Sequence, residues 1–171
     1  MGTCINVFLR CLFLFFGAVH GWMNAMDQPL DYTCPDGMAI EEIESKHDNF
    51  FEDRVFAISC RAMGKALTGC HWTDYVNDFD QNFDFTCPNN SFLSGLSSYH
   101  DNASEDRRWK YYCCSLPATT LNQCYKLPTT HYDWAFSILT PSNFVIRGVS
   151  STQDNFYQDR QYTFELCHLQ P

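Results

Sequence analysis

The sequence Asp53-Arg54-Val55-Phe56 returns twice along this chain, as Asp106-Arg107-Arg108-Trp109 and as Asp159-Arg160-Gln161-Tyr162. The step is 53 residues both times, and a cysteine follows each copy, at Cys60, Cys113 and Cys167. A fixed period held over two steps indicates three copies of one structural unit. The repeat therefore predicts the architecture of the chain.

The match extends well beyond this motif. Residues 24–35 lie over residues 77–88 in the same register, and both segments contain Thr-Cys-Pro at their end. The third copy, residues 133–141, keeps the aspartate, an aromatic residue and the proline but has Thr140 in place of the cysteine. We expect each copy to run from a first strand, through this segment, to an Asp-Asn turn and a closing strand that ends in cysteine.

Alternation of apolar and polar residues predicts that these segments are strands. Phe79, Phe83 and Phe85 alternate with acidic and amide residues, and residues 108–113 and 162–167 alternate similarly. The chain is 45% hydrophobic and 16% aromatic, which suits a globular β-rich domain. The predicted fold is all-β, with three repeats packed around a pseudo-threefold axis. A β-prism built from four-stranded sheets is preferred, and a β-trefoil is the alternative.

The first 21 residues have the features of a secretory signal. An apolar run at residues 11–16 follows Arg10, and small residues come next at Gly17, Ala18 and Gly21. The run is shorter than the ~20 residues that a membrane-spanning helix needs. We expect cleavage of residues 1–21 and release of a single domain into the extracellular space or matrix. Its repeats are assigned to residues 22–69, 70–122 and 123–171.

Cleavage would leave eight of the ten cysteines. An even number in a secreted chain is typical of disulfides, not of metal thiolates. In each of the first two repeats, two equivalent cysteines are 26 residues apart, which predicts one bridge per repeat. The full set of expected bridges is Cys34–Cys60, Cys87–Cys113, Cys70–Cys114 and Cys124–Cys167. Eight cysteines allow about a hundred pairings, so spacing alone leaves the other pairings open.

The charge of the chain limits its partners. Acidic residues outnumber basic ones by 20 to 11, which gives a net charge of −9. Nucleic acids and other polyanions bind to basic surfaces, so we expect no nucleic-acid partner. We also expect no membrane insertion of the secreted domain.

The sequence predicts no enzyme, cofactor or metal site. Its histidines follow no zinc-binding spacing, no Gly-x-Ser-x-Gly motif is present, and bridged cysteines leave no thiol nucleophile. The acidic run 78–84 has the alternation of a calcium loop. However, Phe83 occupies the position that needs glycine, and Asn89 the position that needs glutamate. We therefore expect no catalytic residues.

Two sets of repeated residues are candidate sites. The Asp-Arg pairs of the motif could grip sugar hydroxyls or sulfates, but an arginine fork also suits a buried carboxylate, and we predict this structural role. The Asp-Asn turns are polar, repeated and carried on loops, so they are the candidate ligand loops, although Asp and Asn are also common turn residues. The motif set is Asp53, Arg54, Asp106, Arg107, Asp159 and Arg160. The turn set is Asp48, Asn49, Asp101, Asn102, Asp154 and Asn155.

Two asparagines begin Asn-x-Ser sequons, Asn89 and Asn102, and both are predicted N-glycosylation sites. A glycan on Asn102 would block the second of the three turns as a sugar site.

These residues resemble the dermatopontin family of small secreted proteins. The resemblance rests on the threefold Asp-Arg-x-aromatic motif, on Cys-Pro in the first two repeats, on the Tyr-Tyr-Cys-Cys run at 111–114 and on the segment 146–152. It covers essentially all of residues 22–171. The resemblance implies an extracellular protein that acts by binding and not by catalysis.

On this basis we expect an extracellular-matrix or adhesion protein that binds cell-surface glycans or matrix components, with collagen among the candidate partners. Several weak sites on one rigid body would make it a multivalent lectin able to agglutinate cells, and homo-oligomers are a further candidate. The alternative is a structural matrix component that associates with collagen or biomineral through acidic faces.

Overall fold

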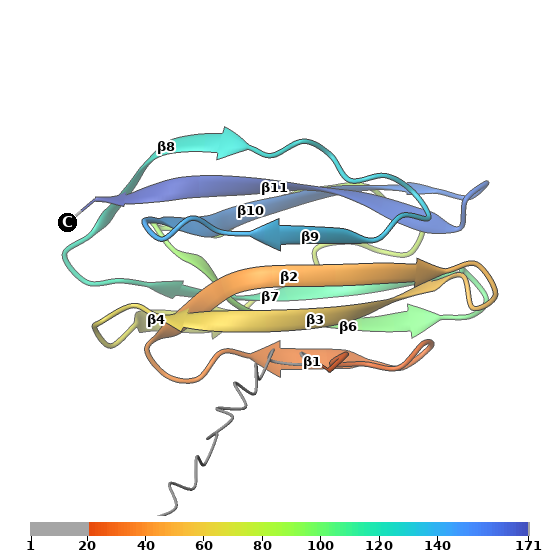
Figure 1. Cartoon of the computed structure of the whole chain (residues 1–171), viewed down its shortest axis with the longest axis horizontal. Coiled ribbons are helices and arrows are strands. Elements are labelled where there is room, and N and C mark those ends of the chain that lie inside the picture. The colour runs from red at the N-terminus through yellow and green to blue at the C-terminus, as the bar shows by residue number, and fades with distance from the viewer. Residues whose placement is uncertain (1–20, 171) are drawn as a thin grey trace, which may run out of the picture.

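The structure, a computed structural model, describes residues 21–170, and these contain eleven β-strands (Figure 1). The signal predicted at residues 1–21 lies outside the described residues, apart from Gly21. Within residues 21–170 no helix is long and apolar enough to cross a membrane. The strands are β1 (Leu30–Thr33), β2 (Met38–Asp48), β3 (Asp53–Ala62), β4 (Thr68–Trp72), β5 (Phe83–Thr86), β6 (Phe92–Asp101), β7 (Asp106–Ser115), β8 (Thr120–Lys126), β9 (Phe136–Leu139), β10 (Phe144–Asp154) and β11 (Asp159–Gln170).

Each repeat contributes one long antiparallel hairpin. The hairpins are β2–β3, β6–β7 and β10–β11, and each closes between two aspartates that face one another in the register. Asp48 faces Asp53 in the first hairpin, and the same pairing recurs 53 and 106 residues later. All three hairpin tips lie at the same end of the molecule (Figure 1). The turns that the Asp-Asn pairs predict therefore lie side by side.

The short strand immediately before each hairpin does not join that hairpin. β1 pairs with β6, β5 pairs with β10, and β9 pairs with β2, so every sheet combines strands from two repeats. The strand orders are β1-β6-β7-β4, β5-β10-β11-β8 and β3-β2-β9. Two sheets have the four strands that the repeat length predicts, and the third has three.

A bulge in each hairpin receives the exchanged strand. The register shifts between Ile40 and Glu42, between Leu93 and Gly95, and between Ile146 and Gly148. Gly95 is required because a Cβ there would lie 2.7 Å from the Tyr32 carbonyl oxygen of β1. Gly148 lies equally close to β5, because a Cβ added there would lie 2.9 Å from the carbonyl oxygen of Phe85.

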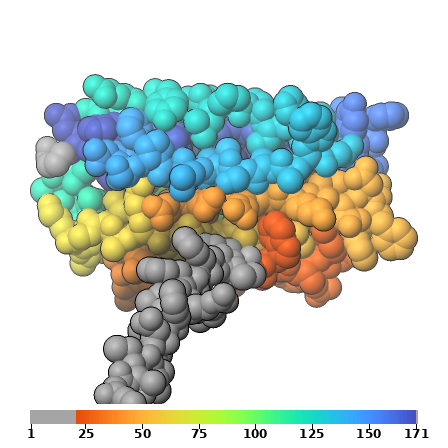
Figure 2. All heavy atoms as spheres, in the orientation of Figure 1, coloured from red at the N-terminus to blue at the C-terminus, as the bar shows by residue number. Residues whose placement is uncertain are grey.

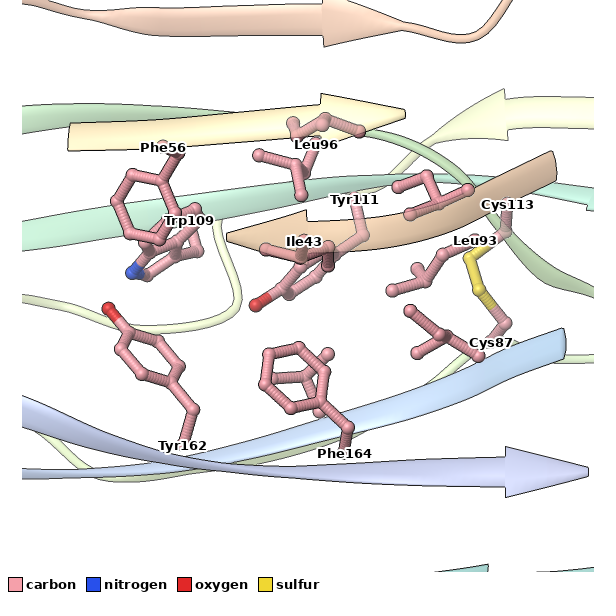
Figure 3. Packing of buried hydrophobic residues seen from close by; sticks show 14 of the residues in the cluster. Ile43, Phe56, Cys87, Leu93, Leu96, Trp109, Tyr111, Cys113, Tyr162 and Phe164 are labelled. Carbon is pink, nitrogen blue, oxygen red and sulfur yellow. A yellow bond between two sulfur atoms is a disulfide. The ribbon is translucent and has the colours of Figure 1, made fainter. Parts of the chain in front are cut away.

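The core lies between the three sheets. Phe56, Trp109 and Tyr162, which share one position of the repeat, meet from β3, β7 and β11 (Figure 3). The ring centroids of Phe56 and Trp109 are 5.2 Å apart, and those of Trp109 and Tyr162 are 5.9 Å apart. The remaining apolar space beside these rings is only about 10 Å³, no more than about one water molecule needs. One closely packed apolar core therefore joins the repeats.

The eight cysteines of the described residues form four disulfides, Cys34–Cys60, Cys70–Cys114, Cys87–Cys113 and Cys124–Cys167. The pairings coincide with the expected set, in which only Cys34–Cys60 and Cys87–Cys113 were predicted from their spacing. Their structural role differs from a link inside one unit, because the cysteines at 34 and 87 follow exchanged strands. Cys34 follows β1 beside β6, so its bridge to Cys60 on β3 connects two sheets.

The first strand of the second repeat is shorter than the alternation of Phe79, Phe83 and Phe85 predicts. It begins at Phe83, and residues 79–82 form a turn and loop. The reason is Asp80, whose backbone adopts a φ of 60° and whose amide donates to the Asp106 carboxylate at 2.9 Å. A tertiary contact therefore overrides the local strand pattern.

Candidate functional site

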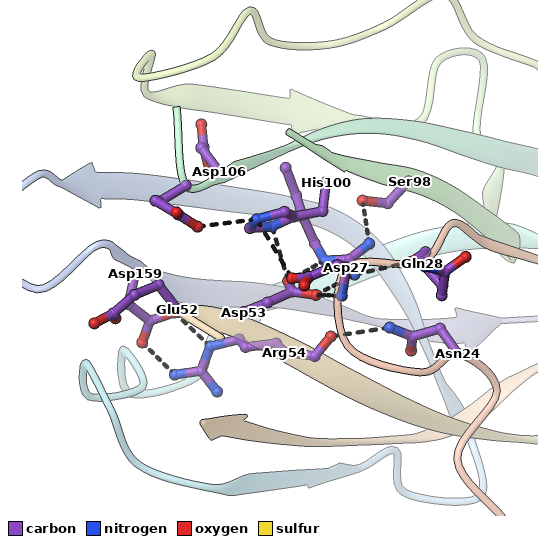
Figure 4. Close-up of polar contacts among 12 residues, drawn as sticks. Asn24, Asp27, Gln28, Glu52, Asp53, Arg54, Ser98, His100, Asp106 and Asp159 are labelled. Carbon is purple, nitrogen blue, oxygen red and sulfur yellow. Dashed lines mark hydrogen bonds and ion pairs between the residues drawn. The ribbon is translucent and has the colours of Figure 1, made fainter. Parts of the chain in front are cut away.

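The three Asp-Arg pairs of the repeated motif form a closed ring. Each arginine donates two hydrogen bonds, from Nε and from a terminal nitrogen, to both oxygens of an aspartate in another repeat. Arg54 binds Asp159, Arg160 binds Asp106, and Arg107 binds Asp53, with N–O distances of 2.5–2.7 Å. Figure 4 shows the fork between Arg54 and Asp159. Because each aspartate precedes an arginine on the same strand, the pairs join β3, β7 and β11 into one circuit.

The backbone before each exchanged strand also binds this ring. The amide of Asp27 donates to Asp53 at 2.8 Å, and those of Asp80 and Asp133 donate to Asp106 and Asp159. All three donor residues have a φ near 60°, which aspartate tolerates better than most residues. The ring therefore holds the chain in the turn that leads to each exchanged strand.

The ring is buried, and its surroundings favour the ionised form of Asp53 and Asp159. Its six side chains belong to residues that are at most 5% exposed. Burial opposes ionisation of Asp159, but the donor groups of His47 and Arg54 close to its oxygens, and their positive charges, lower the pKa of Asp159 to about 2. The same balance, with His100 and Arg107 as the donors, lowers the pKa of Asp53 far below its ordinary value. With its donors occupied, the ring has the arrangement that the structural interpretation of the motif predicts.

At another repeated position, a side chain forms hydrogen bonds with the backbone of the strand that carries the ring arginine. The Asn24 side chain accepts from the amide of Phe56 and donates to the carbonyl of Arg54, and Asn77 does the same for Trp109 and Arg107. In the third repeat, the Thr130 hydroxyl accepts from the amide of Tyr162. We did not assign this role from the sequence, although the 53-residue spacing of the two asparagines was visible in it.

Two histidines also share one position of the repeat, which the search for zinc spacings overlooked. His47 and His100 are buried, and each lies against the ring aspartate of another repeat. The third repeat has Gln153 there, whose amide, oriented as a donor, reaches Asp106 at 3.2 Å. Burial alone would lower the pKa of His100, but the nearby Asp53 carboxylate raises that pKa above its ordinary value.

The Asp-Asn turns carry the hairpin tips. The carboxylates of Asp48 and Asp154 accept from the amides two residues further on, and Asp101 accepts from the amide of Ser104. These aspartates hold the turns in shape, as Asp commonly does. Asn49, Asn102 and Asn155 are exposed at the tips, and the predicted glycosylation site Asn89 is also exposed.

The tips of the first and third hairpins present aromatic residues that sequence reasoning missed. Phe50 and Phe156 occupy one repeat position, and each is 86% exposed. Figure 2 shows these two tips, orange and blue, projecting at the same end of the molecule. The second tip has Ala103 at this position, next to the sequon asparagine Asn102. The three tips therefore differ in chemistry despite their shared backbone.

A polar groove of about 480 Å³ lies on the outer face of β5, β10 and β11. Its walls are mainly hydroxyl, amide and carboxylate side chains, and they belong to Asn82, Asp84, Thr129, Ser150, Thr152, Gln161 and Thr163. At its edge, the Tyr132 hydroxyl lies 3.4 Å from that of Thr152, and the Tyr132 ring stacks on Tyr157. A groove of this size, with polar walls and an aromatic edge, can hold a small polar ligand.

The groove exists because the third repeat has small residues where the second has large ones. Gln161 and Thr163 occupy the repeat positions of Arg108 and Lys110. In the second repeat, the Arg108 guanidinium and the Lys110 ammonium lie 4.5 and 4.3 Å from the centre of the Tyr75 ring. These three side chains occupy the outer face of the second hairpin at the positions where the third hairpin has its groove. The outer faces of the repeats are therefore not equivalent as binding surfaces.

The model of one known family, described as dermatopontin, matches residues 24–171 of the chain. The chain belongs to the dermatopontin family. The family resemblance read from the repeated motif is confirmed. No solved structure matches the chain.

Several curated dermatopontin-family relatives are similar along most of their length. Millepora cytotoxin-1 from Millepora dichotoma is 37% identical over 87% of this chain and 67% of its own. The hemagglutinin/amebocyte aggregation factor of Limulus polyphemus is 35% identical over 88% of both chains. Human dermatopontin is 29% identical over 87% of this chain and 77% of its own. The family thus includes matrix dermatopontins and an aggregation factor.

Proposed function

We propose that this dermatopontin-family protein is a secreted, non-enzymatic binding protein of the extracellular matrix that recognises glycans on matrix components or cell surfaces. The observation that carries the proposal is the similarity to the Limulus hemagglutinin/amebocyte aggregation factor, which extends over 88% of both chains. A protein named for agglutination must bridge cell surfaces, and cell-surface glycans are the ligands that a lectin bridges. The four disulfides suit an extracellular setting.

We further infer that the three repeats form a β-prism around a pseudo-threefold axis. The exchange of β1, β5 and β9 between sheets, and the ring of three Arg-Asp forks, support this arrangement. Three separate sheets with long hairpins favour the prism over the β-trefoil. Such a body would present its three hairpin tips together at one end.

The polar groove of the third repeat is the proposed saccharide site. Sugars present many hydroxyls and an apolar ring face, so hydroxyl and amide walls beside an aromatic edge suit them. The groove has these features in Gln161, Thr163 and the Tyr132 ring, and its volume lies in the range of small-ligand sites. The exposed aromatic tips at Phe50 and Phe156 are a second contact surface at the adjacent end.

A glycan array and a haemagglutination assay test the proposal. The double variant Gln161→Arg, Thr163→Lys gives the groove the residues of the second repeat, and we expect it to lose at least tenfold in glycan affinity. Thr68→Lys, Thr120→Arg adds the same charge at exposed positions outside the groove and should bind as the unmodified protein does.

Agglutination needs at least two binding sites per particle, so its dependence on self-association should be followed by sedimentation. Absence of both glycan binding and agglutination would exclude the lectin proposal. If the groove variant binds glycans as tightly as the unmodified protein, the glycan site does not lie on β10 and β11.

A structural matrix role is the second candidate, supported by the acidic surface. The chain has a net charge of −9, and the side chains of Asp78 and Asp84 are 75% and 70% exposed. Such carboxylates can contact mineral cations or basic regions of collagen. Sedimentation of the protein with calcium carbonate or with collagen fibrils would support this role, and glycan binding without either association would count against it.

A further inference from the structure

His100 is buried among three carboxylates beside the Arg-Asp ring, of which that of Asp53 is buried and those of Asp27 and Glu105 are 26% and 33% exposed. Its Nε2 is 3.2 Å from the Glu105 carboxylate and 3.8 Å from that of Asp27. On the opposite edge of the imidazole, Nδ1 is 3.1 Å from the Asp53 carboxylate. The imidazole is 1% exposed, and it points toward Asp27 and Asp53 (Figure 4). One edge of the histidine therefore faces two carboxylates, and the other edge faces a third.

A second cluster repeats this geometry around His47. Its Nε2 is 3.5 Å from Glu52 and 3.8 Å from Asp133, and its Nδ1 is 3.3 Å from Asp159. The imidazole is fully buried, yet neither ring nitrogen makes a hydrogen bond of good geometry. One carboxylate oxygen of Asp133 and the equivalent oxygen of Asp27 are also buried without a partner. Unpaired buried polar atoms are costly and indicate a missing partner.

The charges of the two clusters favour a cation as the missing partner. Around His100 there are three carboxylates, from Asp27, Asp53 and Glu105, and one guanidinium, from Arg107. Before the imidazole is counted, the cluster has two more negative than positive charges. The cluster around His47 has the same composition, with Arg54 as its guanidinium. A divalent cation would balance either cluster.

We propose that each cluster binds one divalent transition-metal ion, with zinc the best match to its donors. In the first cluster the ligands are His100 Nε2 and the carboxylates of Glu105 and Asp27. In the second they are His47 Nε2 and the carboxylates of Glu52 and Asp133. The Nε2–O distances of 3.2–3.8 Å lie around the separation of about 3.4 Å between two ligands of tetrahedral zinc with bonds of about 2.1 Å.

The outer contacts suit the same ion. When Nε2 binds the metal, Nδ1 carries the proton and donates to Asp53 or Asp159, as in carboxylate–histidine–zinc sites. The ring arginines in turn hold those aspartates in place. Calcium fits less well because it prefers oxygen ligands, whereas an imidazole nitrogen suits zinc and its neighbours.

The third repeat provides an internal control. It keeps Asp80 and Asp106 but has Gln153 where the histidine would be and Gln158 where the glutamate would be. Both substitutions remove a metal ligand, and Gln153 can satisfy Asp106 with an amide hydrogen instead. The chain therefore predicts two metal ions per molecule and not three.

Titration calorimetry on the secreted protein, treated with EDTA and then dialysed, tests the proposal. We expect zinc to bind with a stoichiometry of two, and cobalt to give absorption bands of a low-symmetry site. The variant His100→Gln, Glu105→Gln copies the third repeat and should bind one ion. Addition of His47→Gln and Glu52→Gln should abolish binding, whereas His71→Gln, at an exposed histidine, should leave two sites.

The reverse change makes the test independent of any loss of folding. Gln153→His with Gln158→Glu should create a third site and raise the stoichiometry from two to three. No zinc binding by the unmodified protein, or a stoichiometry that the glutamine variants leave unchanged, would overturn the proposal. An absence of zinc binding would mean that a proton on each imidazole is the cation. A stoichiometry unchanged in the glutamine variants would mean that zinc binds at exposed side chains. Calcium binding with no response to zinc would also overturn it.

Discussion

Arg107 illustrates how one side chain can join two repeats. Its guanidinium binds both oxygens of Asp53 and also donates to the carbonyl of Gln28, close to β1. Arginine suits this position because its planar fork matches a carboxylate and keeps its charge when buried. A buried pair adds little net stability compared with apolar packing, but loss of one partner leaves an uncompensated charge. The cost of a substitution is therefore large and depends on which partner remains.

We expect Arg107→Ala to lower the free energy of unfolding by about 3–5 kcal/mol, because Asp53 would stay buried and unpaired. Arg108→Ala is the matched control on the next residue, whose side chain is 26% exposed and pairs with the exposed Asp78. That change should cost about 1 kcal/mol or less. Urea unfolding under oxidising conditions measures both. Equal costs for the two variants would contradict the structural role of the ring.

Among the elements, the exchanged strands depend on the hairpin bulges. Each exchanged strand is four residues long and lies at the edge of a sheet, so it is held mainly by its pairing with β2, β6 or β10. The close approach of β1 to β6 leaves no room for a side chain at Gly95. In the first repeat, where Glu42 occupies the equivalent position opposite Leu139, a side chain is accommodated. The need for glycine is therefore specific to the second and third hairpins.

Gly95→Ala should destabilise the protein by about 1–3 kcal/mol, because its Cβ meets the backbone of β1 and not a flexible side chain. Hydrogen exchange should show faster exchange of β1 amides than in the unmodified protein. Glu42→Ala, at the equivalent position, should change stability by about 0.5 kcal/mol or less. Protection of β1 that is unaltered in the Gly95 variant would show that the backbone can shift without cost.

For the whole molecule, exchange of strands makes the repeats interdependent. No sheet is complete within one repeat, the apolar core draws residues from β3, β7 and β11, and the ring closes only when all three hairpins are in place. A protein of this kind differs from an open solenoid, in which a repeat contacts only its neighbours. The three repeats should therefore fold and unfold together.

Calorimetry should give a single unfolding transition, with a calorimetric enthalpy equal to the van't Hoff enthalpy. Cys34→Ala with Cys60→Ala removes a link between two sheets and should cost about 2–5 kcal/mol while leaving one transition. Two resolved transitions in the unmodified protein would mean that one repeat unfolds independently.

The sequence predicted more of the scaffold than of the sites. The repeat located the closing strands and matched the cysteines that bridge, because equivalent positions in a repeat have equivalent surroundings. It did not reveal the aromatic tips at Phe50 and Phe156, since a turn residue gives no periodic signal. It also did not reveal the groove beside Gln161, which exists because neighbouring side chains are small.

The repeated Asp-Arg motif by itself determined that the chain has three equivalent β units and that charged pairs recur in each of them. Only the tertiary structure decided which partners those residues have. A strand with a given alternation can pair with its own hairpin or with a neighbouring one, and the local pattern is the same in both cases. The exchange of strands places Asp53 against Arg107 and brings His100 into contact with Asp27, 73 positions earlier in the chain. Sequence spacing predicted no metal site because the ligands that would form one come from different repeats.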